Sequence, residues 1–230
     1  MNGTSYLVGS GEDALLTRVA QRAHQSIGKA IGKPRVTVAV SYAPVAGSAR
    51  GLKFMSSRMR LLFPGADIER FAVEGEKGAT RPEEARAVVE RADLVFVSGG
   101  DPALGARLLD ASGASAWIRD AHARGVATMG VSAGSIALGA WWADWPDDES
   151  GDESEQLART GLVAGIGAVA GHVFDTHNEE DDWDELHIVA KLCAARGKTA
   201  RFMGIPTGGA LVFHGDGSME PVGNPPFILA

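Results

Sequence analysis

The chain has 230 residues, of which 45% are apolar and 22% charged, and its net charge is −7. This length supports one sizeable core, so we expect a single domain over residues 1–230. The acidic balance disfavours nucleic acid and anionic membranes as partners, because such a chain does not neutralise phosphates.

The start of the chain has no basic stretch followed by a long apolar run, so we expect no signal peptide. No window approaches the roughly 18 uninterrupted apolar residues of a membrane span, so we expect no transmembrane helix. Cys193 is the only cysteine, which excludes an intrachain disulfide and suits a reducing compartment. These features predict a cytoplasmic protein.

Short apolar runs that favour strands alternate with helical segments through the first two thirds of the chain. The predicted strands lie at 4–8, 35–42, 68–73, 93–98 and 126–131. The predicted helices lie at 12–29, 47–63, 82–92, 102–110, 114–124 and 133–143. The alternation predicts an α/β fold with a mostly parallel central sheet and helices on both faces. In such a fold the functional site lies at the carboxyl ends of the strands.

The last third of the chain departs from this alternation. Residues 144–156 are acidic and nearly devoid of aliphatic side chains, so we expect a solvated loop. Residues 161–175 predict one or two strands, and apolar residues at helical spacing predict a helix over 180–196. Further short strands are expected at 201–205, 209–213 and 218–222.

Gly130-Val131-Ser132-Ala133-Gly134 matches the G-x-S-x-G pattern between an apolar β run and an apolar helix. A strand that turns directly into a helix strains its corner residue, and small neighbours let other backbone pass close by. The Ser132 hydroxyl is therefore expected above the sheet at a helix N-terminus, where the dipole favours negative charge. This context favours a nucleophile over a tight turn that only requires small residues.

A second glycine-rich corner, Ser98-Gly99-Gly100-Asp101-Pro102, follows the strand predicted at 93–98. Glycine lets backbone N–H groups point into a site with no Cβ in the way. Together with the amide of Ala133, such donors would make an oxyanion hole. The simpler interpretation is an ordinary turn in which Asp101 caps the next helix.

A nucleophilic serine needs a base within hydrogen-bond reach. His177 stands where a predicted strand gives way to a polar turn, which favours it as the base. His172 and His214 are the next candidates. The other three histidines lie within predicted helices and are interpreted as surface or edge residues: His24, His122 and His187.

Four segments occur in an order that resembles the peptidase E (aspartyl dipeptidase) and cyanophycinase family of serine peptidases. They are Ser98–Pro102, Gly130–Ser135, Asp175–His177 and Gly204–Gly208. The resemblance spans most of the chain and implies a fold like that of class I glutamine amidotransferases, with serine in place of cysteine. It also implies that Ser132 is the nucleophile and His177 the base. The amides of Gly100 and Ala133 would then form the oxyanion hole.

The chain departs from that family at the third triad member. Active members carry a glutamate in the late glycine-rich turn, where this chain has Thr207. A threonine hydroxyl can fix the tautomer of an imidazole, but it does not offset the charge of an imidazolium. Asp175, or an acid just after His177, is the alternative partner.

A second departure concerns specificity. Peptidase E uses an arginine beyond its catalytic histidine to hold the aspartate of its substrate, whereas residues 178–185 here are mainly acidic. An acidic substrate would be repelled rather than clamped, which predicts weak or no hydrolysis of Asp-X dipeptides.

The sequence therefore predicts a serine-type peptidase or amidase that hydrolyses a small peptide through an acyl-enzyme on Ser132, with no cofactor or metal. The alternative is a catalytically weak homologue that acts as a binding or regulatory protein, which Thr207 favours. An esterase that uses Ser132, Asp175 and His214 ranks last, because the early glycine-rich motif of lipases is missing.

Three further patterns predict no additional site. Residues 9–14 match a dinucleotide fingerprint formally, but Glu12 and Asp13 would face the pyrophosphate. The acidic run at 178–185 and the nearby histidines match no metal-ligand spacing. The tryptophans at 141, 142 and 145 are expected to pack or to form an interface, and a homodimer stays open.

Overall fold

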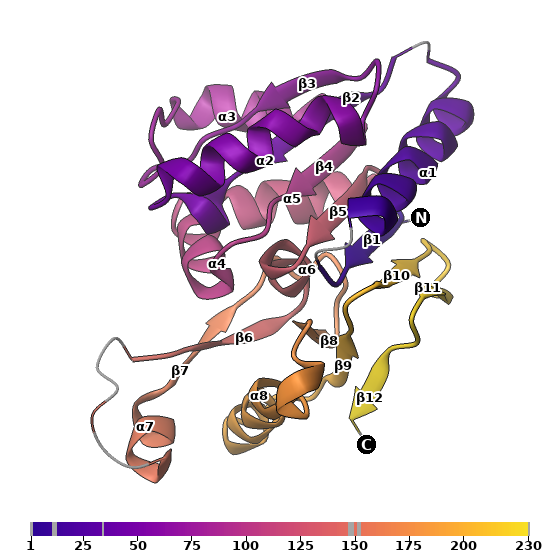
Figure 1. Ribbon diagram of the computed structural model, residues 1–230. Helices are drawn as coiled ribbons and strands as arrows, with labels where there is room; N and C mark the ends of the chain where they lie inside the picture. Colours follow the sequence, from indigo (N-terminus) through magenta and orange to yellow (C-terminus); the bar gives the residue numbers. More distant parts are fainter. Residues whose placement is uncertain (1, 11–12, 34, 147–149, 151–152, 230) are drawn as a thin grey trace.

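The computed structural model describes residues 2–10, 13–33, 35–146, 150 and 153–229. Its main sheet has seven strands in the order β11-β10-β1-β5-β4-β2-β3. The parallel part comprises β1 (Ser5–Val8), β2 (Thr37–Ser41), β3 (Asp67–Arg70), β4 (Leu94–Val97) and β5 (Ala127–Val131). The antiparallel edge comprises β10 (Gly209–Phe213) and β11 (Met219–Gly223). The predicted α/β fold with a mostly parallel sheet is confirmed (Figure 1).

Helices pack on both faces of this sheet because successive strand residues point to opposite sides. One face carries α1 (Asp13–Ile31) and α2 (Ala49–Leu62), which bury Val8 and Phe96 among other side chains. The other face buries Leu7 and Val95 beneath four helices. These are α3 (Pro82–Glu90), α4 (Pro102–Ala111), α5 (Ala114–Ala123) and α6 (Ala133–Leu138). The two layers fix the carboxyl ends of β4 and β5 side by side.

Two smaller sheets accompany the main sheet. The first pairs β8 (His172–Thr176) in parallel with β9 (Arg201–Ile205), and β12 (Phe227–Leu229) runs antiparallel to β9. The second pairs β6 (Trp141–Asp144) with β7 (Gly161–Ala164). The remaining elements are two short 3₁₀ helices and two α-helices: η1 (Ala43–Val45), η2 (Glu179–Asp181), α7 (Glu153–Arg159) and α8 (Asp184–Ala195). Within the described ranges, no helix is both long enough and apolar enough to cross a membrane.

The helix expected over 133–143 is wrong beyond Leu138. The chain becomes extended at Gly139, and residues 141–144 form β6. Tryptophan favours the pleated, half-buried surface of a strand, and Trp142 is buried in the core around α8. The loop expected over 144–156 is also too long, because α7 begins at Glu153. The strand β12 was not predicted from the sequence.

Candidate active site

Ser132 occupies a sharp corner between β5 and α6. Its backbone has φ +50° and ψ −124°, a conformation that costs a non-glycine residue about 1–3 kcal/mol. The backbone N–H of Ser132 donates to the carbonyl of Val8 at 2.9 Å, which fixes the corner to β1. The hydroxyl is thereby held at the carboxyl end of the parallel strands.

The two glycines of the pentapeptide are required by close backbone contacts. A Cβ added at Gly130 would lie 2.5 Å from the carbonyl of Gly134. A Cβ added at Gly134 would lie 2.1 Å from the carbonyl oxygen of Val97 on β4. Both separations are far shorter than van der Waals contact, so α6 can start this close to β4 and β5 only with glycine at these positions.

The second serine of the motif has a structural contact instead. The buried Ser135 hydroxyl donates to the Val8 carbonyl at 2.9 Å and accepts from the Val8 N–H at 3.0 Å. Both bonds tie the first turn of α6 to β1. Ser132 is therefore the hydroxyl of this motif that remains available for chemistry.

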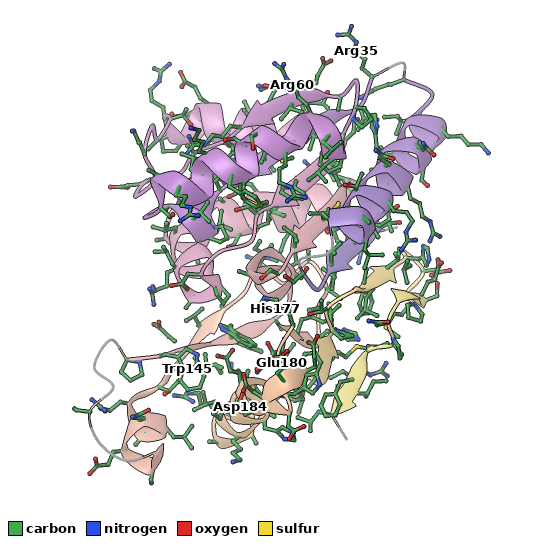
Figure 2. The ribbon with its side chains drawn as sticks, in the orientation of Figure 1. Arg35, Arg60, Trp145, His177, Glu180 and Asp184 are labelled. Atoms are coloured by element: carbon green, nitrogen blue, oxygen red, sulfur yellow. The ribbon has the colours of Figure 1, made fainter. Side chains whose placement is uncertain are left out.

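His177 lies directly after β8 and reaches the corner. Its backbone has φ +47°, and its N–H donates to the carbonyl of Ile205 on β9 at 3.0 Å. The ring Nε2 lies 2.9 Å from the Ser132 Oγ. Figure 2 shows His177 next to α6, with Asp184 farther away at the start of α8. The structure thus brings the predicted nucleophile and the preferred base together.

The two other candidate bases have different partners. His172 stacks on Phe174, and its Nδ1 lies 3.0 Å from the carbonyl of Ala170. His214 lies at the far end of β10, where its Nε2 is 3.6 Å from a carboxylate oxygen of Glu220. Neither ring makes a hydrogen bond to Ser132 in the described part of the chain.

Asp175 is buried and its carboxylate turns to its own loop. One oxygen accepts the Thr176 N–H at 2.7 Å, and the other accepts the side-chain amide of Asn178 at 3.1 Å. Burial raises the pKa of Asp175, and these two hydrogen bonds together with the nearby His177 counteract part of that increase. No hydrogen bond joins Asp175 to the His177 ring among the residues with described positions.

Thr207 contributes a backbone group to the site. Its N–H donates to Oε1 of Glu179 on η2 at 2.9 Å, and no described hydrogen bond links its hydroxyl to His177. The other oxygen of Glu179 is buried without a hydrogen-bond partner in the described ranges. Burial would raise the pKa of Glu179, but hydrogen bonding to Thr207 and the adjacent His177 outweigh it and lower the pKa. Glu179 is therefore a carboxylate with a lowered pKa near His177.

Sequence reasoning did not single out Glu179. The available signal was its place in the acidic run, two residues after His177. That run also contains acids that stay on the surface, such as Glu180. Nothing in the spacing indicates which of them reaches the turn at Thr207.

The loop after β4 lies against the Ser132 side chain. A Cβ added at Gly99 would be 3.9 Å from the Ser132 Oγ. Gly100 has φ +141°, and a Cβ there would lie 2.2 Å from the Pro44 carbonyl oxygen, so this position requires glycine. Asp101 caps α4 by accepting the Leu104 N–H at 2.9 Å. The capped turn expected at Asp101 is confirmed, and the same turn brings glycine backbone close to the Ser132 hydroxyl.

Neither the Gly100 N–H nor the Ala133 N–H donates a hydrogen bond to any residue with a described position. Two unused donors beside a nucleophile are what an oxyanion hole requires. Side chains of His, Cys, Asp and Glu form no group of three or more that could hold a metal ion within the described ranges. The fingerprint at 9–14 falls partly outside the described residues, and Asp13 begins α1.

Comparison with solved structures supports the same fold. A peptidase from an acI-B1 Actinobacterium aligns with a TM-score of 0.71 and 20% identity, over 100% of this chain and 94% of that one. A putative peptidase E protein from Listeria monocytogenes EGD-e aligns with a TM-score of 0.63 and 14% identity, over 98% of this chain and 100% of that one. Curated protein sequences give no match.

The sequence pattern of peptidase family S51 matches residues 7–220, which include the Ser132 corner, the Gly99–Gly100 loop and His177. A match over this share of the chain shows the family rather than a shared fold alone. The chain belongs to peptidase family S51, and it is a serine peptidase.

Proposed function

We propose that the protein hydrolyses small peptides through an acyl-enzyme on Ser132, with His177 as general base. The observation that carries this proposal is the 2.9 Å contact between Ser132 Oγ and His177 Nε2. A serine hydroxyl is a weak nucleophile until an adjacent base accepts its proton. The strained corner and the histidine after β8 supply that pair from segments 45 residues apart.

The reaction would proceed in two steps. Ser132 Oγ attacks the substrate carbonyl while its proton passes to His177, and the same proton then leaves with the departing amine. Water next attacks the acyl-enzyme and gives one proton to His177. His177 then donates that proton to Ser132 Oγ as the bond to the acyl group breaks, which releases the acid and the free serine. In both tetrahedral intermediates the oxyanion would accept hydrogen bonds from the N–H groups of Gly100 and Ala133. Each such bond typically stabilises the transition state by about 3 kcal/mol.

Glu179 is our candidate for the carboxylate that supports His177. Its pKa is lowered, and its Oε1 accepts the Thr207 N–H at 2.9 Å. The His177 N–H donates to Ile205, which ends β9 two residues before Thr207. A negative charge there favours the imidazolium that forms during attack. The Thr207 backbone N–H would then position the Glu179 carboxylate. Asp175 would stabilise the turn after His177 by accepting a hydrogen bond from the Asn178 side chain.

The substrate is expected to be non-acidic. The segment after His177 presents several exposed carboxylates, and no lysine or arginine lies between His177 and Lys191. Like charge raises the cost of bringing an acidic peptide to this side of the site. We expect weak or no hydrolysis of Asp-X dipeptides, and robust turnover of Asp-Leu by the purified protein would contradict this part of the proposal.

The proposed mechanism is tested with a fluorophosphonate probe and the mass of the intact protein. Wild-type protein should gain one adduct, mapped to Ser132. The adduct should be absent in Ser132→Ala and form at least about 100-fold more slowly in His177→Ala. His214→Ala serves as the control and should be labelled at the wild-type rate.

Equal labelling of His177→Ala and wild type would show that the base assignment is wrong. No labelling of the wild-type protein would instead favour the alternative, a homologue that binds peptides without cleaving them. That alternative rests on the lack of a hydrogen bond between His177 and any carboxylate in the described part of the chain.

A further inference from the structure

A pocket of about 320 Å³ opens directly beside the Ser132 side chain. Its floor is formed by Ser132 and the Gly99–Gly100 loop, and its walls come from α2, η1 and the start of α1. Most side chains that line it are apolar: Leu16, Val45, Phe54, Met55 and Val131. The volume is at the lower end for ligand sites, which suits one or two side chains.

One face of α2 forms the outer wall. Gly51, Phe54, Met55 and Arg58 line the pocket, and their spacing of three and four residues places them on one side of a helix. Phe54 is 55% exposed although it is a large apolar side chain. The guanidinium of Arg58 lies over the Phe54 ring, 5.0 Å from its centre. An aromatic side chain with Arg58 over its ring therefore lines this side of the pocket.

The position of His177 indicates which half of a substrate enters this pocket. The base must return its proton to the departing amine, so the leaving group lies on the His177 side of the carbonyl carbon. His177 does not line the pocket, and in Figure 1 α2 lies above α6 whereas β8 lies below it. The pocket therefore faces the acyl half of the substrate, beside the loop that would hold the oxyanion.

We propose that this pocket receives an aliphatic or aromatic side chain of the residue whose carbonyl is attacked. This inference rests on the proposed function and adds the class of substrate: peptides with leucine, methionine or phenylalanine on the acyl side of the scissile bond. A side chain of this kind gains by leaving water for apolar walls. A charged side chain would lose hydration against the same walls.

The test uses peptide aldehydes that differ only in the side chain next to the aldehyde: leucine, alanine, glutamate or lysine. The Ser132 Oγ adds to the aldehyde carbon, the hydroxyl proton passes through His177 to the aldehyde oxygen, and a reversible hemiacetal forms. Each compound is titrated for its ability to slow labelling of Ser132 by the fluorophosphonate. This readout does not require rapid peptide turnover.

We expect the leucine aldehyde to protect Ser132 at concentrations about tenfold or more below the alanine compound. The glutamate and lysine compounds should be no better than alanine. In Phe54→Ala the preference for leucine over alanine should fall about threefold. Leu61→Ala is the matched control, because Leu61 is 57% exposed on the same helix but does not line the pocket. This variant should keep the wild-type preference for the leucine over the alanine aldehyde.

The outcomes separate this inference from the proposed function. Two results would contradict the apolar pocket while leaving the serine mechanism intact. In the first, Ser132 is labelled but the leucine aldehyde protects it no better than the alanine aldehyde. In the second, the glutamate aldehyde protects best, as expected if its carboxylate pairs with Arg58. An equal loss of preference in Phe54→Ala and Leu61→Ala also contradicts the apolar pocket. Absence of labelling on Ser132 contradicts the proposed function itself.

Discussion

The two sides of the Ser132 hydroxyl are built by different means. On one side, Gly130 and Gly134 let β4, β5 and α6 approach so closely that the backbone itself fixes the corner. On the other side, His177 and Glu179 follow a short strand of the three-stranded sheet. The His177 N–H donates to Ile205 at the end of β9, and Glu179 accepts the N–H of Thr207 on the turn that follows.

This difference predicts how each side responds to change. A Cβ added at Gly130 or Gly134 would lie within 2.5 Å of neighbouring backbone, so substitutions at these two glycines should cost stability. Side-chain contacts in a half-exposed acidic loop can be lost singly, so substitutions there should change the reaction rate more than the fold.

The largest effect is expected for Gly134→Ala. The added Cβ would meet the Val97 carbonyl at 2.1 Å, and α6 would have to move away from β4. The free energy of unfolding in urea should fall by about 3 kcal/mol or more. Gly47→Ala is the control, since nothing lies within 4 Å of a Cβ at Gly47, and it should change stability by less than about 0.5 kcal/mol. Equal losses in the two variants would refute the packing account.

On the histidine side, Glu179→Gln should reduce kcat about 10- to 100-fold, or about 1.4–2.7 kcal/mol in the barrier. The amide can still accept the Thr207 N–H, but it does not offset the imidazolium charge. KM and the free energy of unfolding should change little, which distinguishes positioning from a structural role. Glu180→Gln provides the control on the same 3₁₀ helix. A rise in KM with an unchanged kcat would argue against this role.

Glu185 lies in the first turn of α8, shortly after η2, and its ionisation makes the stability of this region depend on pH. Burial, followed by the carboxylates of Asp175, Asp184 and Asp181, raises the pKa of Glu185 to about 7. The unfolded chain releases this proton near pH 4.3. The folded state therefore binds more protons between about pH 4.3 and 7, and stability falls as pH rises through this window.

Glu185→Gln removes that penalty. Its free energy of unfolding should exceed that of wild type by about 1–2 kcal/mol at pH 8, after solvent screening, and match it at pH 4. Urea titrations at the two pH values measure the difference, with Glu74→Gln as an exposed control. A stabilisation that is the same at both pH values would show that charge is not its cause.

The smallest effect concerns the strain at the corner. Ser132→Gly should raise the free energy of unfolding by about 1 kcal/mol, because relief of the positive φ outweighs the greater entropy of glycine in the unfolded chain. Ser132→Ala keeps the Cβ and should not gain this stability. If both variants match wild-type stability, the corner stores no strain.

The same contrast explains what the sequence could predict. Gly130, Ser132 and Gly134 are neighbours in the chain, so the requirement for small residues at a strand-to-helix corner is visible locally. The parallel sheet followed from the alternation of apolar runs and helical segments. His177 could be preferred as the base because a predicted strand gives way to a polar turn at that residue, and the structure places its ring beside Ser132.

Other features depend on contacts that no local pattern encodes. Glu179 contacts Thr207, which is 28 residues away in the chain. At Thr207 the backbone N–H makes this contact and not the side chain, so the residue type gives no signal for it. The early end of α6 follows from the approach of Gly139 to the His172 carbonyl, where a Cβ would lie at 3.1 Å. The pocket beside Ser132 likewise brings together residues of α2 and the Gly99–Gly100 loop, which are about 45 residues apart in the chain.

The most direct measurement is a crystal structure of the protein with a leucine-type peptide aldehyde. We predict a bond from Ser132 Oγ to the aldehyde carbon. The former aldehyde oxygen should accept hydrogen bonds from the N–H groups of Gly100 and Ala133, and the His177 ring should stay within hydrogen-bond distance of the adduct. An aldehyde bound away from Ser132, or an adduct whose oxygen points away from both amides, would contradict this prediction.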